Sequence, residues 1–376
     1  MKNIYGRVLK ITKLGKMLAF ITISSDGAII RLVAQQQIEL PKKGDYVSIS
    51  YLMIAGEKKI KNIKVISHPR TIIALPQFIA RNHDPLSLEA LMLRSKVEEA
   101  MINFLIKKKF SIIHSPTIVG KWVKGRTGSF DIRFYSADAS LSISNMLYHI
   151  MIMQSGYENI FEISKIFRQE NPSDRYRLAE FTMLDIGVAN KDKSHIMKTY
   201  ENLILAAVEG VRRANPRYHK LPDNINFAHI EYNELLKKTG MSRIEGAQLP
   251  QKIRLYLNEN YNSFVWIENF DKKTRPFFVK SYGNVCNDYQ LWFRGVEYLA
   301  AGGERETNYQ ILCSNILDKG KDIAEYDFYL KSIDYGCPQS MFGIGMGVER
   351  FMGCVLSNGT AADYAWFPRY KKMLYP

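Results

Sequence analysis

The stretch FEISKIFRQENPSDRYRLAEF, residues 161–181, is the most informative part of this 376-residue sequence. Its alternating apolar residues predict a strand with Arg168 and Glu170 on one face, and the Asn-Pro-Ser-Asp cluster that follows is typical of a turn. A return strand that ends in Glu180 and Phe181 completes the hairpin. An arginine fork suits a phosphate, an aromatic ring suits a purine face, and a carboxylate suits an exocyclic amine. The hairpin therefore carries side chains that can bind ATP.

Three further blocks lie C-terminal to this hairpin. GGERE spans residues 302–306, GIGMGVERF spans residues 343–351, and WFPR spans residues 366–369. The hairpin resembles motif 2 of the class II aminoacyl-tRNA synthetases, and GIGMGVERF resembles their motif 3. GGERE and FPR resemble segments of the asparaginyl and aspartyl (class IIb) branch, and the blocks stand in the family's order. The chain is therefore similar to an asparaginyl-tRNA synthetase or a paralogue of one.

The resemblance implies an α+β fold, in which a class II synthetase antiparallel sheet flanked by helices is preceded by a small OB-type β-barrel. Motif 1 has the weakest pattern, an apolar helix over about residues 95–109, then Phe110 and a strand that ends at Pro116. In the family this motif forms the dimer interface, so a homodimer is expected. Residues 191–278 contain a helical run over 194–213 and are otherwise expected to be scaffold.

Five apolar segments between residues 4 and 67 alternate with turns and predict five short strands, as in an OB-type barrel. We expect an OB-type domain over residues 1–68, a proline-containing hinge over 69–90 and the catalytic domain over 91–376. The barrel resembles the anticodon-binding domain of the class IIb branch, in which Phe20 matches a phenylalanine that stacks on a tRNA base. A position in the barrel core is an equally good interpretation of Phe20.

The resemblance also implies how ATP is bound. Arg168 contacts the α-phosphate and the substrate carboxylate, Arg350 contacts the γ-phosphate, and Phe181 stacks on adenine. In-line transfer at phosphorus needs positioned charge and neither a general base nor a covalent nucleophile, so Arg168, Glu170 and Arg350 are expected to be catalytic. The ATP-binding residues that the resemblance implies are Arg168, Glu170, Arg175, Arg177, Phe181, Glu297, Gly347 and Arg350.

Binding of ATP implies Mg²⁺, a hard cation that carboxylates and phosphates hold. Glu297 is the candidate metal ligand, although it lies one residue further from Arg305 than the family spacing. Glu304 is a weaker candidate. The four cysteines have no CxxC spacing, which indicates reduced thiols rather than a zinc site or disulfides. We expect no structural metal.

The amino-acid pocket departs from the family pattern within LSISNMLYHI, residues 141–150. The family's pocket glutamine falls at Met146, and its aspartate-recognising lysine falls at His149. Arg305 is retained, and its counterpart in the aspartate branch binds the side-chain carboxylate of the substrate. Packing on a helix is the slightly favoured interpretation of His149. The substrate-binding residues that the resemblance implies are Ser144, Met146, His149, Gly302 and Arg305.

Composition and charge narrow the choice of partners. The net charge is +15 and the pI is about 9.4, which favours a polyanionic partner such as tRNA, although the basic residues are spread along the chain. The apolar runs are too short to span a bilayer, and the N-terminus lacks a signal-peptide pattern. We therefore expect a cytoplasmic protein.

Two functions remain open. The first is activation of an asparagine- or aspartate-like amino acid as an adenylate, followed by its transfer to tRNA. The second is a tRNA-independent ligase that forms an amide from the adenylate, which the altered pocket favours. A catalytically inactive paralogue is disfavoured, because Arg168, Glu170, Phe181 and Arg350 are all present.

Overall fold

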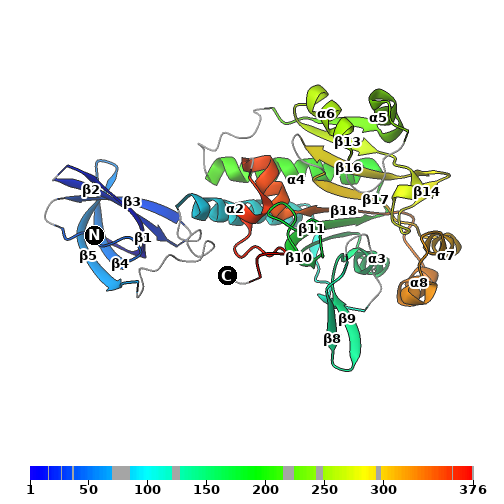
Figure 1. Cartoon of the computed structure of the whole chain (residues 1–376), viewed down its shortest axis with the longest axis horizontal. Helices are drawn as coiled ribbons and strands as arrows, with labels where there is room; N and C mark the ends of the chain where they lie inside the picture. Colours follow the sequence, from blue (N-terminus) through cyan, green and yellow to red (C-terminus); the bar gives the residue numbers. More distant parts are fainter. Residues whose placement is uncertain are drawn as a thin grey trace. The chain divides into compact units, whose positions relative to one another are not determined.

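The structure is a computed structural model of the 376-residue chain. It describes residues 1–15, 17–26, 28–35, 38–69, 85–120, 128–214, 224–242, 249–293, 298–357 and 359–374. The chain divides into two compact units, one formed by Met1–Ser95 and the other by Lys96–Leu374 (Figure 1). Most of the predicted hinge, residues 70–84, lies outside the described residues, and helix α2 begins at Pro85. The predicted domain boundaries stay a prediction.

The first unit contains a closed five-stranded barrel, which confirms the OB-type prediction. Its strands are ordered β1-β2-β3-β5-β4 around the barrel, and β1 also pairs with β4. Along β2, Ala19, Ile21 and Ile23 point into the core, whereas Phe20 and Thr22 lie half-buried on the outer face. The barrel-core interpretation of Phe20 is therefore wrong. The strands are β1 (Lys2–Leu14), β2 (Leu18–Ser25), β3 (Ala28–Gln35), β4 (Tyr46–Ile54) and β5 (Glu57–Ser67).

The second unit is built on an eight-stranded sheet ordered β12-β13-β16-β17-β18-β11-β10-β6. The pairs from β13 to β10 are antiparallel, whereas β12 and β6 run parallel to their neighbours at the two edges. This arrangement confirms the predicted antiparallel sheet. Its strands are β6 (Ser111–Ile112), β10 (Asn159–Phe167), β11 (Glu180–Ala189), β12 (Phe227–Glu231), β13 (Phe264–Glu268), β16 (Asp288–Phe293), β17 (Ala300–Glu304) and β18 (Met341–Gly347).

Helices cover both faces of this sheet. Helix α4 packs an apolar stripe on one face, where Glu201 Oε1 accepts the Trp266 indole N–H at 3.1 Å. Helix α3 packs on the other face, near β10 and β11, and α5 and α6 lie beside β13 (Figure 1). The helices are α2 (Pro85–Lys107), α3 (Met146–Gln154), α4 (Lys193–Ala214), α5 (Tyr232–Thr239), α6 (Gln251–Asn260), α7 (Tyr309–Asp318), α8 (Asp327–Tyr335) and α9 (Val348–Phe351).

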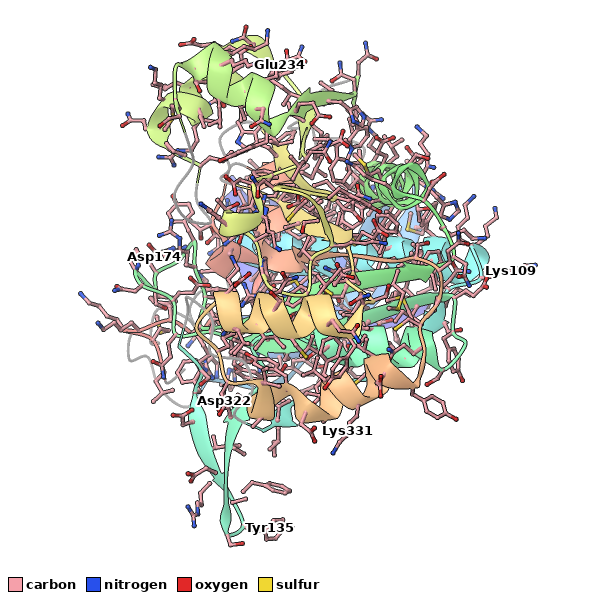
Figure 2. All side chains as sticks on the ribbon, turned by 90° about the vertical axis from the view of Figure 1, so that its right-hand side faces the viewer. Lys109, Tyr135, Asp174, Glu234, Asp322 and Lys331 are labelled. Carbon is pink, nitrogen blue, oxygen red and sulfur yellow. The ribbon has the colours of Figure 1, made fainter. Side chains whose placement is uncertain are left out.

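The second unit also contains two small sheets. β7 (Ile118–Val119), β8 (Asp131–Phe134) and β9 (Ala137–Leu141) form a three-stranded sheet, and Tyr135 lies at the tip of its β8–β9 hairpin, away from the large sheet (Figure 2). β14 (Ser281–Tyr282) and β15 (Val285–Cys286) form a second hairpin. Helix α4 confirms the helical run predicted over residues 194–213.

The motif 2 hairpin differs from its prediction in one respect. The last paired residues are Phe167 and Glu180, so Arg168 and Glu170 follow β10 instead of lying along it. Glu180 and Phe181 begin β11 and do not end it, because the apolar residues that follow continue as a buried central strand. The predicted motif 1 strand is also shorter than expected, since β6 ends at Ile112.

None of the described helices is both long enough and apolar enough to cross a membrane.

Candidate active site

The candidate active site lies on the face of the large sheet that β11, β18 and β17 share. Asp185 of β11 pairs with Gly345 of β18, which pairs with Ala301 of β17, so their side-chain positions lie on one face. At Gly345 a Cβ atom would overlap the Asp185 carboxylate, and at Gly343 it would lie 2.5 Å from Arg305 Nη2. The glycines of motif 3 are therefore required by the two charged side chains that lie over them.

Four of the predicted ATP-binding residues lie together where β11 and α9 begin. The guanidinium carbon of Arg168 lies 5.3 Å from the centre of the Phe181 ring. A Cβ atom added at Gly347 would lie 3.9 Å from that ring and 3.7 Å from Arg350 Cβ. Phe181 and Arg350 therefore border one glycine, and the Arg168 guanidinium lies over the same aromatic ring, which suits a nucleotide with several phosphates.

The two guanidinium groups keep donors for a ligand. Arg168 Nε donates to the Ile143 carbonyl at 3.0 Å, and Arg350 Nη1 donates to the Tyr298 carbonyl at 3.3 Å. Neither arginine pairs with a carboxylate of the described residues. An arginine has about five N–H donors, so most of them remain for phosphate oxygens. Glu170 lies in the loop after Arg168 with its side chain half-buried.

The loop over residues 168–179 holds the other two predicted ATP-binding arginines. Asp174 Oδ1 accepts the Arg177 amide at 3.0 Å and so shapes the loop, and Figure 2 shows Asp174 at its outer edge. Arg175 is exposed and forms an ion pair with Asp363. Arg177 is partly buried. A role for Arg175 on the triphosphate therefore requires it to exchange Asp363 for phosphate.

Arg305 lies on the same face of the sheet and is almost completely buried. Its side chain is 2% exposed, and its Nε and Nη2 atoms have no hydrogen-bond partner within the described ranges. Its guanidinium carbon lies 5.4 Å from the centre of the Phe278 ring, and burial lowers the pKa of Arg305. A buried charged group with unsatisfied N–H donors is costly, so this position suits an anionic group that a ligand brings.

Asp185 is the site residue that the motif comparison did not single out. It is 6% exposed, and burial raises the pKa of its carboxyl from 3.8 to about 6. The charges of His149 and Glu162, and those of Arg168 and Arg305, also act on this carboxyl. Asp185 therefore links the nucleotide side of the site to Arg305. A carboxylate within the buried run TMLDIGVA was the signal that could have identified it.

His149 belongs to a buried polar network beside this site. It is 2% exposed, and its Nε2 atom lies 2.7 Å from Glu162 Oε2. Glu162 also accepts bonds from the Ser115 amide and hydroxyl and from Asn145 Nδ2. Burial raises the pKa of Glu162, but hydrogen bonds from His149 and Ser115 outweigh burial and lower it. The geometry favours packing as the role of His149, with an influence on the site through the charge near Asp185.

The other predicted substrate residues do not gather around Arg305. Ser144 Oγ accepts the Met146 amide at 3.4 Å where α3 begins, and the Met146 side chain packs against the apolar core beneath α3. Gly302 lies on the opposite face of β17, where an added Cβ atom would lie 2.7 Å from the buried ring of Tyr289. Close packing accounts for this glycine.

The two candidate metal ligands are Glu297 and Glu304. Glu297 lies outside the described residues. Glu304 is 4% exposed and already binds Lys280 Nζ at 2.9 Å, Asn287 Nδ2 at 2.8 Å and the Tyr282 hydroxyl at 3.2 Å. Its oxygens are therefore occupied by neighbouring side chains. In the described part of the chain, no three His, Cys, Asp or Glu residues are grouped to hold a metal ion.

Known proteins resemble this chain in sequence and in fold. The aspartate–tRNA(Asp) ligase of Pyrococcus furiosus is 30% identical over 314 residues, which cover 78% of this chain and 70% of that protein. The aspartate–tRNA(Asp/Asn) ligase of Methanocaldococcus jannaschii is 24% identical over 416 residues, which cover 99% of this chain and 94% of that protein.

Solved structures agree with these relatives. The crystal structure of asparaginyl-tRNA synthetase from Pyrococcus horikoshii complexed with asparaginyl-adenylate superposes with a TM-score of 0.85 at 22% identity, and the match covers 100% of this chain and 96% of that one. The family described as tRNA synthetases class II (D, K and N) matches residues 78–371. The chain therefore belongs to this family of class II tRNA synthetases, and it is an ATP-dependent ligase that activates an amino acid and joins it to tRNA.

Proposed function

We propose that the enzyme activates aspartate with ATP, forms aspartyl-adenylate and transfers the aspartyl group to tRNA. The observation that carries the choice of aspartate is the buried guanidinium of Arg305, whose Nε and Nη2 atoms have no partner among the described residues. A side-chain carboxylate would neutralise this charge, whereas the amide of asparagine would leave it uncompensated in a buried site. The relatives named above as aspartate ligases support the same choice.

The charges around the pocket match the three charged groups of aspartate. Asp185 lies under the combined influence of Arg168 and Arg305. We assign the substrate ammonium to Asp185, its α-carboxylate to Arg168 and its side-chain carboxylate to Arg305. Each assignment pairs opposite charges at a buried or half-buried site, where Coulombic attraction is stronger than in water.

The nucleotide side then follows from the cluster at Gly347. Phe181 offers a flat face to adenine, and Arg168 is shared between the α-phosphate and the attacking carboxylate. Arg350 neutralises the γ-phosphate as pyrophosphate leaves in line with the attack. The substrate carboxylate is already ionised, so positioning and charge neutralisation are sufficient for the step. Glu170 is proposed to orient Arg168 or the adenine, and Arg175 and Arg177 to approach the bent triphosphate.

Magnesium is proposed as a companion of the ATP phosphates. Mg²⁺ commonly takes one or two protein carboxylates and completes its coordination with phosphates and water. The described residues do not provide a protein-built metal site, since Glu304 is occupied by Lys280 and its neighbours. Glu297 remains the candidate ligand, and the steps above depend on the arginines alone.

The homodimer proposed from motif 1 has a surface to support it. The two-residue strand β6 is the edge of the large sheet, and Ile112 on this strand is 51% exposed. Ile106 at the end of α2 is also 51% exposed. Exposed apolar side chains beside an open sheet edge suit pairing with a second copy of the chain. A cytoplasmic location is proposed with the same function.

The test is amino-acid-dependent exchange of pyrophosphate into ATP, measured without tRNA over all common amino acids. Aspartate is expected to support exchange with at least about tenfold higher kcat/KM than asparagine, because loss of one charge-assisted contact costs about 1.5–3 kcal/mol. Aspartate-dependent charging of unfractionated tRNA should follow. Exchange that prefers asparagine would overturn the aspartate assignment, and exchange without charging would indicate the tRNA-independent ligase.

A further inference from the structure

A cavity beside the end of β11 carries positive charge that the active site does not use. Its volume is about 510 Å³, and its described lining comes from three separate segments of the second unit. Lys108 follows α2, Asn159 begins β10, and Lys191 lies between β11 and α4. The volume falls within the range of about 300–1,000 Å³ that small-molecule sites occupy.

The cavity is distant from the nucleotide cluster of the active site. Phe181 lies at the start of β11, whereas Lys191 follows the end of the same strand. A strand rises about 3.3 Å per residue, so roughly 30 Å separates the two ends of β11. In Figure 2, Lys109 beside the cavity and Asp174 of the motif 2 loop lie on opposite sides of the unit. A ligand in the cavity therefore leaves the active site free.

Two lysines of the cavity lack a compensating charge. The ammonium groups of Lys108 and Lys191 form no hydrogen bond or ion pair within the described part of the chain. Lys198 also lines the cavity, but it pairs with Glu201 at 3.0 Å. The two free ammonium groups come from different segments, so a single anionic ligand can contact both of them.

Asp192 is the one carboxylate among the described lining residues, and it is already engaged. Its Oδ1 atom accepts the His195 amide at 2.8 Å and the Ser194 hydroxyl at 2.8 Å, as an N-cap residue does at the start of a helix. Asp192 therefore satisfies the start of α4, and the binding capacity of the cavity comes from side chains.

Neutral polar groups of the cavity are also unengaged. The side chains of Asn159, Thr199 and Asn202 are half-buried and form no hydrogen bond with another described residue. Phe110 is 6% exposed and provides an apolar wall. Amide groups both donate and accept, so the cavity can hold a ligand by hydrogen bonds as well as by charge.

Stabilisation of α2 explains only part of this basic surface. Lys107, Lys108 and Lys109 end α2, where positive charge favours a helix by itself. That effect does not account for Lys191, which comes from another segment and lines the same cavity. A ligand that contacts both segments accounts for both lysines.

We propose that this cavity is a second anion site, in which Lys108 and Lys191 bind the phosphates of a small di- or triphosphate ligand. Two free ammonium groups call for at least two negative charges, which a diphosphate carries and a single carboxylate does not. Lysine acts as a point charge and is a common phosphate binder. The site goes beyond the proposed function and does not depend on it.

The experiment titrates the full chain with inorganic tripolyphosphate by calorimetry, without magnesium and at about 0.15 M salt. Arg350→Ala provides a background in which phosphate binding at the active site is weakened. One site per chain should survive in this background. Adding Lys108→Ala or Lys191→Ala should weaken that site about tenfold, as expected for one lost charge-assisted contact.

Lys107→Ala is the matched control, because Lys107 is exposed at the same helix end and does not line the cavity. It should weaken the site no more than about twofold, as expected for one screened surface charge. Equal effects of Lys107→Ala and Lys108→Ala would overturn the proposal, because binding would then reflect diffuse charge. Loss of all tripolyphosphate binding in Arg350→Ala would also overturn it.

GTP in place of tripolyphosphate identifies the source of the phosphates. Tighter binding of GTP that Asn202→Ala abolishes would support the site and assign it to a nucleotide, whereas equal affinities would support it as a site for free polyphosphate. Binding of a short duplex RNA without any binding of tripolyphosphate would overturn the proposal in favour of a nucleic-acid surface.

Pyrophosphate exchange is the independent readout and should be unchanged in Lys108→Ala and Lys191→Ala. Absence of exchange in the wild-type enzyme would refute the proposed function and leave the result for the cavity standing.

Discussion

The nucleotide side and the amino-acid side of the active site hold their charges in opposite ways. Arg168 and Arg350 are half-buried at the ends of elements, and each is held by one backbone carbonyl. Asp185 and Arg305 are buried on the sheet, 6% and 2% exposed. Half-buried charges change the free energy of folding only slightly. Buried charges destabilise the fold until a ligand compensates them. The two sides should therefore respond differently to mutation.

The largest effect is expected on the nucleotide side. Arg168→Ala and Arg350→Ala should each lower kcat/KM for pyrophosphate exchange by about a hundredfold to a thousandfold. Each change removes a positive charge that stabilises the phosphate oxygens in the transition state. The melting temperature of each variant should stay close to that of the wild-type protein. Lys165→Ala is the control, since Lys165 is an exposed lysine of β10 next to the site. Wild-type exchange in either arginine variant would remove the nucleotide assignment.

A slightly smaller loss of activity, joined to a gain in stability, is expected on the amino-acid side. Arg305→Met should lower kcat/KM for aspartate about a hundredfold while KM for ATP stays close to wild type. The free energy of unfolding without ligands should rise by about 1–2 kcal/mol, because a buried guanidinium whose Nε and Nη2 atoms lack hydrogen-bond partners among the described residues is replaced by an apolar chain of similar volume. Chemical denaturation measures this change. A strongly destabilised Arg305→Met protein would show that Arg305 is compensated inside the fold.

A tenfold effect is expected from pH. Burial raises the pKa of Asp185 to about 6, so the carboxyl is protonated below that pH in the free enzyme. The affinity for the substrate ammonium should therefore rise as pH increases from 5 to 7 and stay level above. The stability of the unliganded fold changes in the opposite sense, and it should fall by about 3 kcal/mol between the unfolded pKa of 3.8 and the folded value.

The pH profile needs a control, because the terminal phosphate of ATP also titrates at about pH 6. Asp185→Asn removes the protein carboxyl and leaves the ATP titration in place. Its kcat/KM for aspartate should be low and should lose the rise between pH 5 and 7. A rise that persists unchanged in Asp185→Asn would assign the titration to ATP and not to Asp185.

The smallest effect on activity is expected at Glu304, which separates a structural carboxylate from a metal ligand. Glu304→Gln keeps the shape of the bonds to Tyr282 and Asn287 and loses the ion pair with Lys280. The free energy of unfolding should fall by about 1–3 kcal/mol, the cost of leaving a partly buried cation without its partner. The magnesium concentration that gives half-maximal exchange should not move, and a large increase in it would make Glu304 a metal ligand.

The success of the sequence predictions differs between the same two sides. On the nucleotide side, turn residues and glycines close in the sequence identify the site residues, and the structure brings these residues together. They are Arg168, Phe181, Gly347 and Arg350. Asp185 lies in an apolar run and gains its importance from β10 and β18 on either side, which only the sheet register reveals. His149 was similarly ambiguous, because its partner Glu162 lies on another element.

Strand limits show the same dependence on tertiary contacts. The alternation in residues 161–167 predicted β10, but the start of β11 at Glu180 depends on its burial between two neighbouring strands. In the barrel, the alternation of apolar segments with turns predicted five strands. The closure of the barrel, which puts Phe20 outside beside Arg31, required the pairing of β1 with β4 and of β3 with β5.

The most direct test of the account is calorimetric binding of two stable adenylate analogues, in which a sulfamate replaces the phosphate, to the wild-type enzyme. One analogue carries an aspartyl group and the other an asparaginyl group, so they differ only in the group that faces Arg305. The account predicts that the aspartyl analogue binds at least about tenfold more tightly and that Arg305→Met abolishes this preference. Equal or reversed affinities in the wild-type enzyme would contradict the assignment of Arg305 to a substrate carboxylate.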